Sequence, residues 1–435
     1  MDSILVLLVF LGVMMGLAVI RVPLALAILA GAMVGFWMTG RSFGIIAPSA
    51  FSALDVFAYL AVPGFLYAGA LMLHGRIAAA ILGLFHNLAQ RFRGVLGSIT
   101  VAVAMLFGTI SGSSVATVSM VGGMMVPELV KRGFTRARAG ALVAATGVLG
   151  VLLPPSIPGI VFAISAGQSV SAVWLTTVMP AILLALIWAV IAFFQGRESA
   201  QAEDRDQTMT PTALSGERKR GAFVHALPAL AAPVLIFGGI YGGILTPTEA
   251  GATVVAYCLI IGFFVYKGLH LGNIGRITFE AARASASILI IISAAVVSAR
   301  LFTLIGLPRE LTAFVLDINP DPLMFILLMN ILLLVIGMFM ETNTAILILT
   351  PILLPIAQSL GIDPLHFGAM MLLNLELGMI TPPLAANLFV ACKIASVPFN
   401  KIMPPIMPYF LSGLFVLAIT ALFPAFSLSI VALLN

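Results

Sequence analysis

The sequence has 435 residues, of which 61% are hydrophobic and only 9% are charged, and its mean hydropathy is +1.18. A soluble domain carries about 25% charged residues, so this composition excludes an ordinary soluble surface. The net charge is +5. In a membrane protein, Lys and Arg gather on the cytoplasmic side, so this positive charge is interpreted as a signal of membrane orientation and not of nucleic-acid binding. The chain is therefore expected to be an all-α polytopic membrane protein that contacts membrane lipid and no nucleic acid.

Apolar segments long enough to cross about 30 Å of hydrocarbon recur along the chain. In the first half, the plausible crossings are residues 4–20, 24–39, 57–74, 139–167 and 173–194. The fourth crossing contains "LLPPS" at residues 152–156. Proline lacks a backbone N–H and displaces the turn before it, so 139–167 is predicted to be a broken helix.

The stretch 94–130 lies between the third and fourth crossings and is apolar, but "GTISGSSVATV" at residues 108–118 interrupts it. A single crossing would place Arg91 and Arg93 on the opposite side of the membrane from Lys131 and Arg132. A re-entrant hairpin keeps all four basic residues in the cytoplasm, where such residues are preferred. Residues 94–130 are therefore predicted to dip into the membrane and return.

A hydrophilic segment at 195–222 divides the chain near its middle and is predicted to be a cytoplasmic linker. It holds 10 of the 37 charged residues, which are 21 Lys or Arg and 16 Asp or Glu. The second half offers crossings at 223–243, 249–266, 284–305, 366–396 and 404–430. It also offers a second re-entrant hairpin at 322–358, interrupted by "ETNT" at 341–344, and a second broken helix, 366–396, at "ITPPLAAN" (380–387).

The two halves, 1–194 and 223–435, share a pattern of glycine and proline at a fixed offset of 228 residues. The matching pairs are Pro127 and Pro355, Gly133 and Gly361, Gly140 and Gly368, Gly150 and Gly378, Pro154 and Pro382, Pro155 and Pro383, and Pro180 and Pro408. Glycine and proline dictate backbone shape, so this coincidence predicts repeated structure. Each half has an odd number of crossings, which makes the repeat inverted, as in many secondary transporters. A cytoplasmic linker then places 18 of the 21 Lys and Arg residues inside.

The polar interruptions are expected to meet near the centre of the membrane. Irregular backbone at that depth must be buried in protein or line a water-filled site. The N-terminus of a half-helix presents free N–H groups to an anion, and the C-terminus presents carbonyl groups to Na⁺. Two hairpin tips and two proline breaks are thus predicted to form one central site, although a single proline in a membrane helix can be a simple kink.

Acidic residues inside apolar segments are functional candidates. Glu341 could ligate a cation, carry a proton or cap the half-helix that follows it, and Glu376 could pair across helices or orient the hairpin tip. Glu249 belongs to "TPTE" (246–249), which is typical of a capping box. No enzyme is expected, because the histidines lie at predicted segment ends, no HExxH motif occurs and Ser113 and Ser114 have no evident base. A channel is disfavoured because the polar groups cluster at one depth.

At these residues the sequence resembles the large membrane subunit of the tripartite ATP-independent periplasmic (TRAP) transporters, within the ion-transporter superfamily. The strings that carry the resemblance are "SGSSVATV", "GVLLPPSI", "GGIYGGILTPTEAGA", "PILLPIAQSLGIDPLHFG" and "GMITPPLAANLFVA". They occur in the family's order and cover essentially the whole chain.

The resemblance implies an elevator mechanism, in which the hairpins and broken helices form a transport domain that slides against a scaffold. It places one Na⁺ between the first tip and the first proline break, a second Na⁺ between the second tip and the second break, and an organic acid between the tips. The implied sodium ligands are Ser111, Gly112, Ser113, Ser114, Gly150, Pro154, Pro155, Glu341, Thr342, Asn343, Thr381 and Pro382. The implied contacts to the acid are Ser113, Ser114, Ser156, Thr342, Asn343, Thr344 and Asn387. Na⁺ is the coupling ion, and no other cofactor is expected.

The family also implies two partners, a small membrane subunit of the four-helix type and a periplasmic substrate-binding protein, in a bacterial inner membrane. The alternative is a stand-alone Na⁺/carboxylate symporter or Na⁺/H⁺ antiporter of the same superfamily. Ala385 departs from the family, which usually has glycine there, and its methyl group would lie near the cavity and affect substrate size. The sequence leaves open which acid is carried, the number of Na⁺ ions and the oligomeric state.

Overall fold

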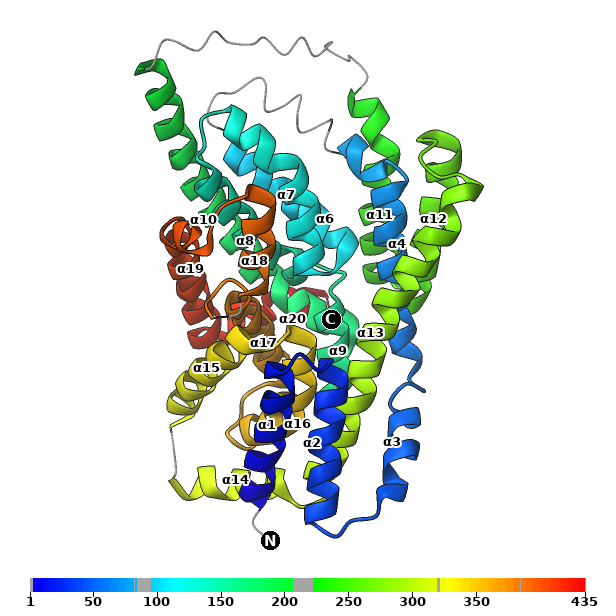
Figure 1. The fold of residues 1–435 in the computed structure, drawn as a ribbon, viewed down its shortest axis with the longest axis vertical. Helices are drawn as coiled ribbons and strands as arrows, with labels where there is room; N and C mark the ends of the chain where they lie inside the picture. Colours follow the sequence, from blue (N-terminus) through cyan, green and yellow to red (C-terminus); the bar gives the residue numbers. More distant parts are fainter. Residues whose placement is uncertain are drawn as a thin grey trace.

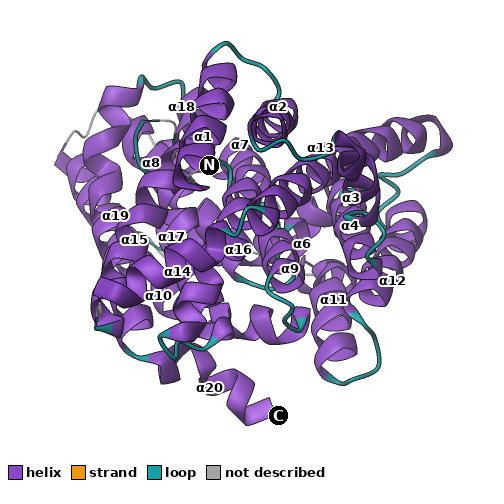
Figure 2. Cartoon of the chain, turned by 90° about the horizontal axis from the view of Figure 1, so that it is seen from below, coloured by secondary structure: helices purple, strands orange, loops and turns teal. Residues whose placement is uncertain are grey.

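The computed structural model describes residues 3–81, 83, 95–205, 222–318, 321–383 and 385–434. These residues form helices and connecting turns, with no strand among them. Eight of the described helices are long and apolar enough to cross a membrane. The all-α, multi-pass class predicted from composition is confirmed. The helices pack around a central group that includes α6, α9 and α16, whereas α11, α12 and α20 lie at the edge of the bundle (Figure 2).

The first half of the chain contains α1 to α10 with two short 3₁₀ turns. In chain order the elements are α1 (Ser3–Val19), α2 (Leu24–Met38), η1 (Phe43–Ile45), α3 (Ile46–Ser52), η2 (Phe57–Leu60), α4 (Ala61–His74), α6 (Leu96–Ser111), α7 (Ser114–Lys131), α8 (Arg136–Leu152), α9 (Ile157–Ser165) and α10 (Val170–Arg205). The helix predicted to break at "LLPPS" ends at Leu152 and resumes at Ile157 with a bend of 44°.

The second half contains α11 to α20 and one π-helical turn. Its elements are α11 (Ala222–Tyr241), α12 (Pro247–Ile260), η3 (Ile261–Val265), α13 (Leu271–Leu304), α14 (Leu307–Ile318), α15 (Pro322–Phe339), α16 (Thr342–Ser359), α17 (Pro364–Gly378), α18 (Ala386–Ala395), α19 (Phe399–Leu422) and α20 (Pro424–Leu434). A helix break again spans the predicted proline pair, between α17 and α18. The capping box at 246–249 is present at the start of α12.

Several boundaries differ from the predicted segments. The predicted linker begins at 195, but α10 continues to Arg205 because "RESAQAEDR" consists mostly of good helix formers. Residues 206–221 of that linker, and residue 94 at the start of the first predicted hairpin, lie outside the described residues. Helix α13 begins at Leu271, well before the predicted 284, because a capping box at His270 and Asn273 starts it there.

The two pairs of interrupted helices lie in different halves of the molecule. Helices α6 and α7 lie above the centre of Figure 1 and α15 and α16 lie below it, while α14 runs across the long axis at the bottom. The chain ends that adjoin residues 206–221 lie at the top of this view, and the N-terminus lies at the bottom. The polar interruptions of both helix pairs approach each other in the middle of the molecule.

Glycine contacts join each interrupted helix pair to a broken helix. An added Cβ on Gly108 of α6 would overlap the Cα of Gly150 on α8, and a Cβ on Gly378 of α17 would lie 2.6 Å from the Cα of Gly337 on α15. Only glycine allows two helix backbones to approach this closely. The same type of crossing therefore occurs once in each half of the chain.

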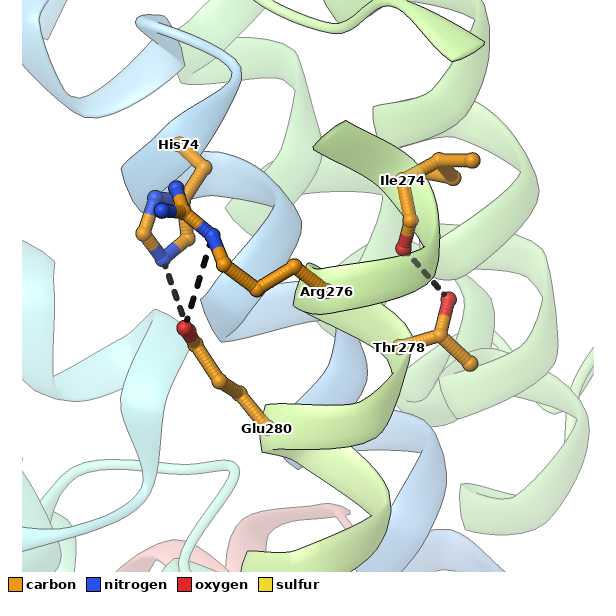
Figure 3. A network of polar contacts seen from close by, with 5 residues as sticks. All are labelled: His74, Ile274, Arg276, Thr278 and Glu280. Carbon is orange, nitrogen blue, oxygen red and sulfur yellow. Dashed lines mark hydrogen bonds and ion pairs between the residues drawn. The ribbon is translucent and has the colours of Figure 1, made fainter. Parts of the chain in front are cut away.

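Helices α4 and α13 form a wall next to these helix pairs and are linked by polar contacts. The Nε2 atom of His74 lies 3.1 Å from Oε2 of Glu280, and Nε of Arg276 lies 3.7 Å from Oε1 of the same carboxylate (Figure 3). The hydroxyl oxygens of Tyr67 and Thr278 are 2.8 Å apart. The pair of Arg276 and Glu280 lies within α13, whereas the other two contacts join α13 to α4. All three are exposed and individually weak.

Candidate functional site

A cavity of about 90 Å³ lies between the two helix interruptions. The first interruption contributes Gly112, Ser113, Ser114 and Val115, and the second contributes Glu341, Thr342 and Asn343. The remaining lining residues are Leu66 of α4, Val151 of α8, Ile157 and Pro158 of α9, Ile288 of α13, Glu376 of α17 and Met379. Because a buried water needs about 10–15 Å³ of such space, the cavity holds a cluster of roughly six water-sized atoms.

The first tip turns at Gly112, whose φ of 57° lies in the left-handed region that favours glycine. The tip is fastened to the first proline break. The Ile157 N–H donates to the Gly112 carbonyl oxygen at 3.3 Å, and a Cβ on Gly112 would lie 2.9 Å from the Pro155 carbonyl oxygen. The structure thus brings the first predicted tip and the first predicted break into direct contact.

Hydroxyl groups inside the first tip bond to one another. The hydroxyl of Thr117 donates to the Ser113 carbonyl oxygen at 2.9 Å, and the Ser111 and Thr117 hydroxyl oxygens are 2.9 Å apart. A Cβ on Gly150 would overlap Thr117. The sequence interpretation missed Thr117, although its spacing of four residues from Ser113 on a helix was a usable signal.

The three helices that begin at this cavity differ in their caps. The Ser156 hydroxyl accepts from the Gly159 N–H at 3.1 Å and caps α9. The Glu341 carboxylate accepts from the Thr344 N–H at 3.2 Å and caps α16. Ser113 stands at the N-cap of α7 but makes no side-chain cap. Helix α7 therefore points uncapped N–H groups, and the partial positive charge of its N-terminus, towards the cavity.

Glu341 has an exposed side chain that lines the cavity. Its Oε1 accepts from the Asn343 side-chain amide at 2.5 Å, and its Oε2 makes the cap of α16. The capping alternative for Glu341 is therefore confirmed. The exposed carboxylate retains lone pairs that face the cavity, so the cap leaves it able to bind a cation as well.

Glu376 is the acid that the sequence-based ligand sets omitted. Its side chain is only 1% exposed and lines the cavity. The Thr342 hydroxyl donates to Oε1 at 2.7 Å, whereas Oε2 accepts no hydrogen bond. Ser114 and Glu341 also lie close enough to interact with this carboxylate. The expectation that Glu376 orients the second tip agrees with the bond to Thr342.

Not every predicted site residue lines the cavity. Those that do are Gly112, Ser113, Ser114, Glu341, Thr342 and Asn343. The predicted site residues that are not part of this lining are Ser111, Gly150, Pro154, Pro155, Ser156, Thr344, Thr381, Pro382 and Asn387. The Thr381 hydroxyl donates to the Leu377 carbonyl of its own segment at 2.7 Å. The apolar walls, Leu66, Val151 and Ile288 among them, carried no signal that distinguishes them from ordinary membrane-helix residues.

Asn387 and Ala385 lie at the start of α18. Asn387 has no exposed surface, and neither side-chain atom of its amide has a hydrogen-bond partner. It faces α8, since a Cβ on Gly147 would lie 3.0 Å from its Nδ2. Ala385 has a φ of 38° and is 1% exposed, and it does not line the cavity. Position 385 therefore favours glycine because of its backbone, and the extra methyl group does not narrow the cavity.

Comparisons with known sequences match this chain over nearly its full length. The family profile described as "Tripartite ATP-independent periplasmic transporter, DctM component" matches residues 4–426. The C4-dicarboxylate TRAP transporter large permease protein DctM of Pseudomonas aeruginosa is 34% identical, with 92% of each chain covered. The sialic acid TRAP transporter large permease protein SiaM of Vibrio cholerae is 32% identical, with 97% of this chain and 95% of the relative covered.

A further relative is longer than this chain. The isethionate TRAP transporter permease protein DctMQ of Oleidesulfovibrio alaskensis is 35% identical over 94% of this chain, and the chain spans 63% of that relative's length. Two solved structures share the fold. The YdaH transporter of Alcanivorax borkumensis is 14% identical with a TM-score of 0.63, and 87% of this chain and 88% of that chain are covered. MtrF of Neisseria gonorrhoeae is 15% identical with a TM-score of 0.59, and 86% and 83% are covered.

Proposed function

The chain belongs to the DctM family of TRAP transporters and is the large permease subunit of a secondary transporter, and from this premise we propose that it takes up an organic acid together with Na⁺. The observation that carries the proposal is the composition of the cavity. It combines the uncapped N-terminus of α7 with the carboxylates of Glu341 and Glu376, and no Lys, Arg or His is among its lining residues.

The carboxylate of the acid binds the N–H groups at the start of α7. A helix N-terminus attracts an anion through its free N–H groups and its dipole. The hydroxyls of Ser113 and Ser114, which line the same end of the cavity, add two neutral donors. This arrangement binds a carboxylate without a basic side chain.

Na⁺ accompanies the acid because the cavity is otherwise too negative. Two like charges 4 Å apart repel by about 4 kcal/mol at an effective dielectric constant near 20, so a bare anion beside Glu341 and Glu376 binds poorly. The oxygen atoms of Glu341, Thr342 and Asn343 are hard ligands that suit Na⁺ at the second tip. The Gly112 carbonyl and the hydroxyls of the first tip supply a second set, in keeping with the sodium positions that the family resemblance implies.

Transport follows the elevator scheme of an inverted repeat. The two interrupted helix pairs act as re-entrant hairpins and move with α8, α9, α17 and α18, while α4 and α13 stay in the scaffold. Leu66 and Ile288 of those scaffold helices form the apolar wall past which the loaded site moves. The subunit works in a bacterial inner membrane with a small membrane subunit and a periplasmic binding protein that delivers the acid.

Uptake by the complete complex in proteoliposomes tests this function. We expect uptake of the acid to stop when Na⁺ is replaced by K⁺ outside the vesicles, because the proposed coupling ion is then absent. Removal of the binding protein should also stop it, whereas a stand-alone symporter or antiporter would continue. Full-speed uptake in K⁺ would refute sodium coupling and leave the family assignment intact.

Two single substitutions locate the coupling ion. Ser113→Ala and Thr342→Ala should each raise the Na⁺ concentration for half-maximal uptake about fivefold, since a lost hydroxyl contact costs about 1 kcal/mol. The matched controls are Ser119→Ala and Thr303→Ala, whose exposed hydroxyls donate to carbonyls of their own helices. Equal Na⁺ dependence in site and control variants would remove Ser113 and Thr342 from the ion sites.

A further inference from the structure

Six basic side chains form a cluster where the end of α4, the turn before α13 and the first turns of α13 meet. They are His74, Arg76, Lys267, His270, Arg276 and Arg283. Glu280 is the one acid of α4, η3, the turn and α13. Four Lys or Arg residues thus stand against one Glu, which leaves this basic cluster with a net charge of +3 when both histidines are neutral.

Two glycines bring the end of α4 and the turn before α13 into direct contact. A Cβ on Gly268 would lie 2.5 Å from the Gly75 carbonyl carbon and 2.9 Å from Cγ of Arg76, which is closer than any side chain allows. The Gly268 carbonyl oxygen also accepts from the side-chain amide of Asn273 on α13 at 3.0 Å. Arg76 and Lys267 each adjoin one of these glycines, so the contact holds them side by side.

Only part of the positive charge in this cluster is balanced. The Glu280 carboxylate lies 3.1 Å from His74 and 3.7 Å from Arg276, so both groups share one acid (Figure 3). Arg76 and Lys267 make no ion pair with any residue that the structure describes. Like charges held this close repel each other, and an anion bound between them would remove the repulsion.

The backbone does not explain why Arg76 and Lys267 are basic. Both residues adopt the left-handed conformation, with φ of 62° and 51°. This conformation favours glycine, which has no Cβ to crowd the following carbonyl. Glycine would therefore suit both turns better, and the charged side chains need a reason outside the turns. An observed backbone outlier of this kind supports a hypothesis of function.

Exposed apolar side chains lie next to the basic cluster and favour a lipid over a soluble anion. Phe264 of η3 is 76% exposed, and Leu271 and Phe279 of α13 are 86% and 69% exposed. Apolar and basic side chains in one segment are typical of the headgroup region of a membrane. A soluble anion would leave these three side chains in water, whereas a phospholipid covers them with its acyl chains.

The basic cluster lies at the end of the molecule that adjoins residues 206–221. The hydroxyl of Tyr266, next to Lys267, donates to the carbonyl oxygen of His225 at 2.6 Å, and His225 belongs to the first turn of α11. This end is expected to face the cytoplasm because of its positive charge. Anionic headgroups of the cytoplasmic leaflet attract basic segments next to a membrane, so this leaflet is the source of the lipid.

We propose that the basic cluster binds the headgroup of an anionic phospholipid from the cytoplasmic leaflet. Arg76 and Lys267 bind the phosphate, and the acyl chains cover Phe264 and Phe279. The bound lipid fixes the cytoplasmic ends of α4 and α13 at the membrane surface. This site goes beyond the proposed transport function, since neither Na⁺ nor the acid takes part in it.

Thermal unfolding of the purified full-length chain in detergent micelles tests the proposal. The probes are dioleoyl phosphatidylglycerol, which is anionic, dioleoyl phosphatidylcholine, which is zwitterionic, and inorganic phosphate. We expect half-maximal stabilisation by phosphatidylglycerol at a mole fraction at least about tenfold lower than by phosphatidylcholine. Inorganic phosphate at the same total concentration should not shift the unfolding temperature.

Two double variants locate the lipid. Arg76→Gln with Lys267→Gln should raise the phosphatidylglycerol mole fraction for half-maximal stabilisation about 25-fold, because each basic residue near a membrane surface contributes about fivefold. Lys393→Gln with Lys401→Gln is the matched control, since these exposed lysines of α18 and α19 carry the same charge on other helices, and it should change by less than about twofold. If the first variant does not fold, Arg76→Gly with Lys267→Gly replaces it, because glycine suits both left-handed turns.

The outcomes separate a lipid from the other ligands that could meet this charge. Equal stabilisation by both phospholipids would overturn the proposal, and so would equal losses in the two double variants, which would mean attraction by net charge alone. Stabilisation by inorganic phosphate would mean a site for a soluble anion. An unchanged lipid response in the Arg76 and Lys267 variant, together with loss of copurification with the small membrane subunit, would mean a protein-docking surface. None of these results bears on the Na⁺ dependence of uptake, which tests the proposed function separately.

Discussion

Ala385 adopts a left-handed backbone conformation, with φ 38° and ψ 62°, at the start of α18. In this region the Cβ of an L-residue crowds the following carbonyl, at a cost of about 1–2 kcal/mol. Glycine avoids that cost but loses about 0.5–1 kcal/mol through the entropy of the unfolded chain. We expect Ala385→Gly to raise stability by up to about 1 kcal/mol and to leave the preference among acids unchanged, because residue 385 does not line the cavity.

Thermal unfolding of Ala385→Gly, together with acid-binding measurements, checks this expectation. Ala395→Gly, at the end of the same helix and fully buried, is the control and should be destabilising. If Ala385→Gly changed the preference for larger or smaller acids, residue 385 would have to contact the substrate.

The polar residues that line the cavity could be predicted from the sequence, whereas the apolar residues that line it could not. Ser113, Ser114, Thr342 and Asn343 stand out in the sequence because hydrogen-bonding groups are costly in hydrocarbon, and all four line the cavity. Glu376 stood out for the same reason, but its position six residues before Pro382 gave no indication that it faces the cavity. Leu66 and Ile288 could not be found, since only tertiary packing distinguishes them from residues that face lipid.

The close crossing of α15 and α17 at Gly337 and Gly378 helps to determine the position of the second tip. Gly378→Ala would place a methyl group 2.5 Å from the Gly337 carbonyl carbon, and overpacking of this kind costs about 1–3 kcal/mol. Since α15 leads directly to the tip at Glu341, the displaced helix would also move the tip. We expect Gly378→Ala to lower thermal stability by that amount and to weaken Na⁺-dependent uptake.

Gly123→Ala on α7 is the control for this crossing. A Cβ there meets nothing within 4 Å, so the substitution should stabilise the helix by about 0.5–1 kcal/mol. Both effects are read from melting curves of the purified chain. An equal change in thermal stability in Gly378→Ala and Gly123→Ala would show that the α15–α17 crossing tolerates a side chain.

Helix breaks were easier to predict than helix lengths. Proline pairs interrupt α8–α9 and α17–α18 because proline removes a hydrogen bond and clashes with the preceding turn. The extension of α10 to Arg205 and the early start of α13 at Leu271 depend on helix propensity and capping in polar segments. A prediction from hydropathy ends a helix where the apolar residues stop, so it misses the polar parts of α10 and α13.

At the scale of the whole molecule, the distribution of charge predicts the orientation of the chain in the membrane, and the two interrupted helix pairs lie on opposite sides of the centre of the molecule (Figure 1). If both pairs are re-entrant hairpins of an inverted repeat, the two ends of the second pair lie outside, and the end of the first pair lies in the cytoplasm. We expect single cysteines at Asp321 and Gln358 to react with an impermeant maleimide from outside intact cells. A cysteine at Lys131 should react only after the cytoplasmic side is opened.

These three positions are informative because each is exposed and lies at or next to the end of a helix of one pair. Cys258 and Cys392 are first replaced by alanine to leave one reactive thiol per variant. Arg197→Cys near the linker end of α10 is the control for the cytoplasmic side, where positive charge is concentrated. Labelling of Asp321→Cys and Gln358→Cys from opposite sides would mean that α15 and α16 together cross the membrane once. Labelling of Lys131→Cys from the outside would mean that the halves are not inverted, and the two tips could not then meet from opposite faces around the cavity.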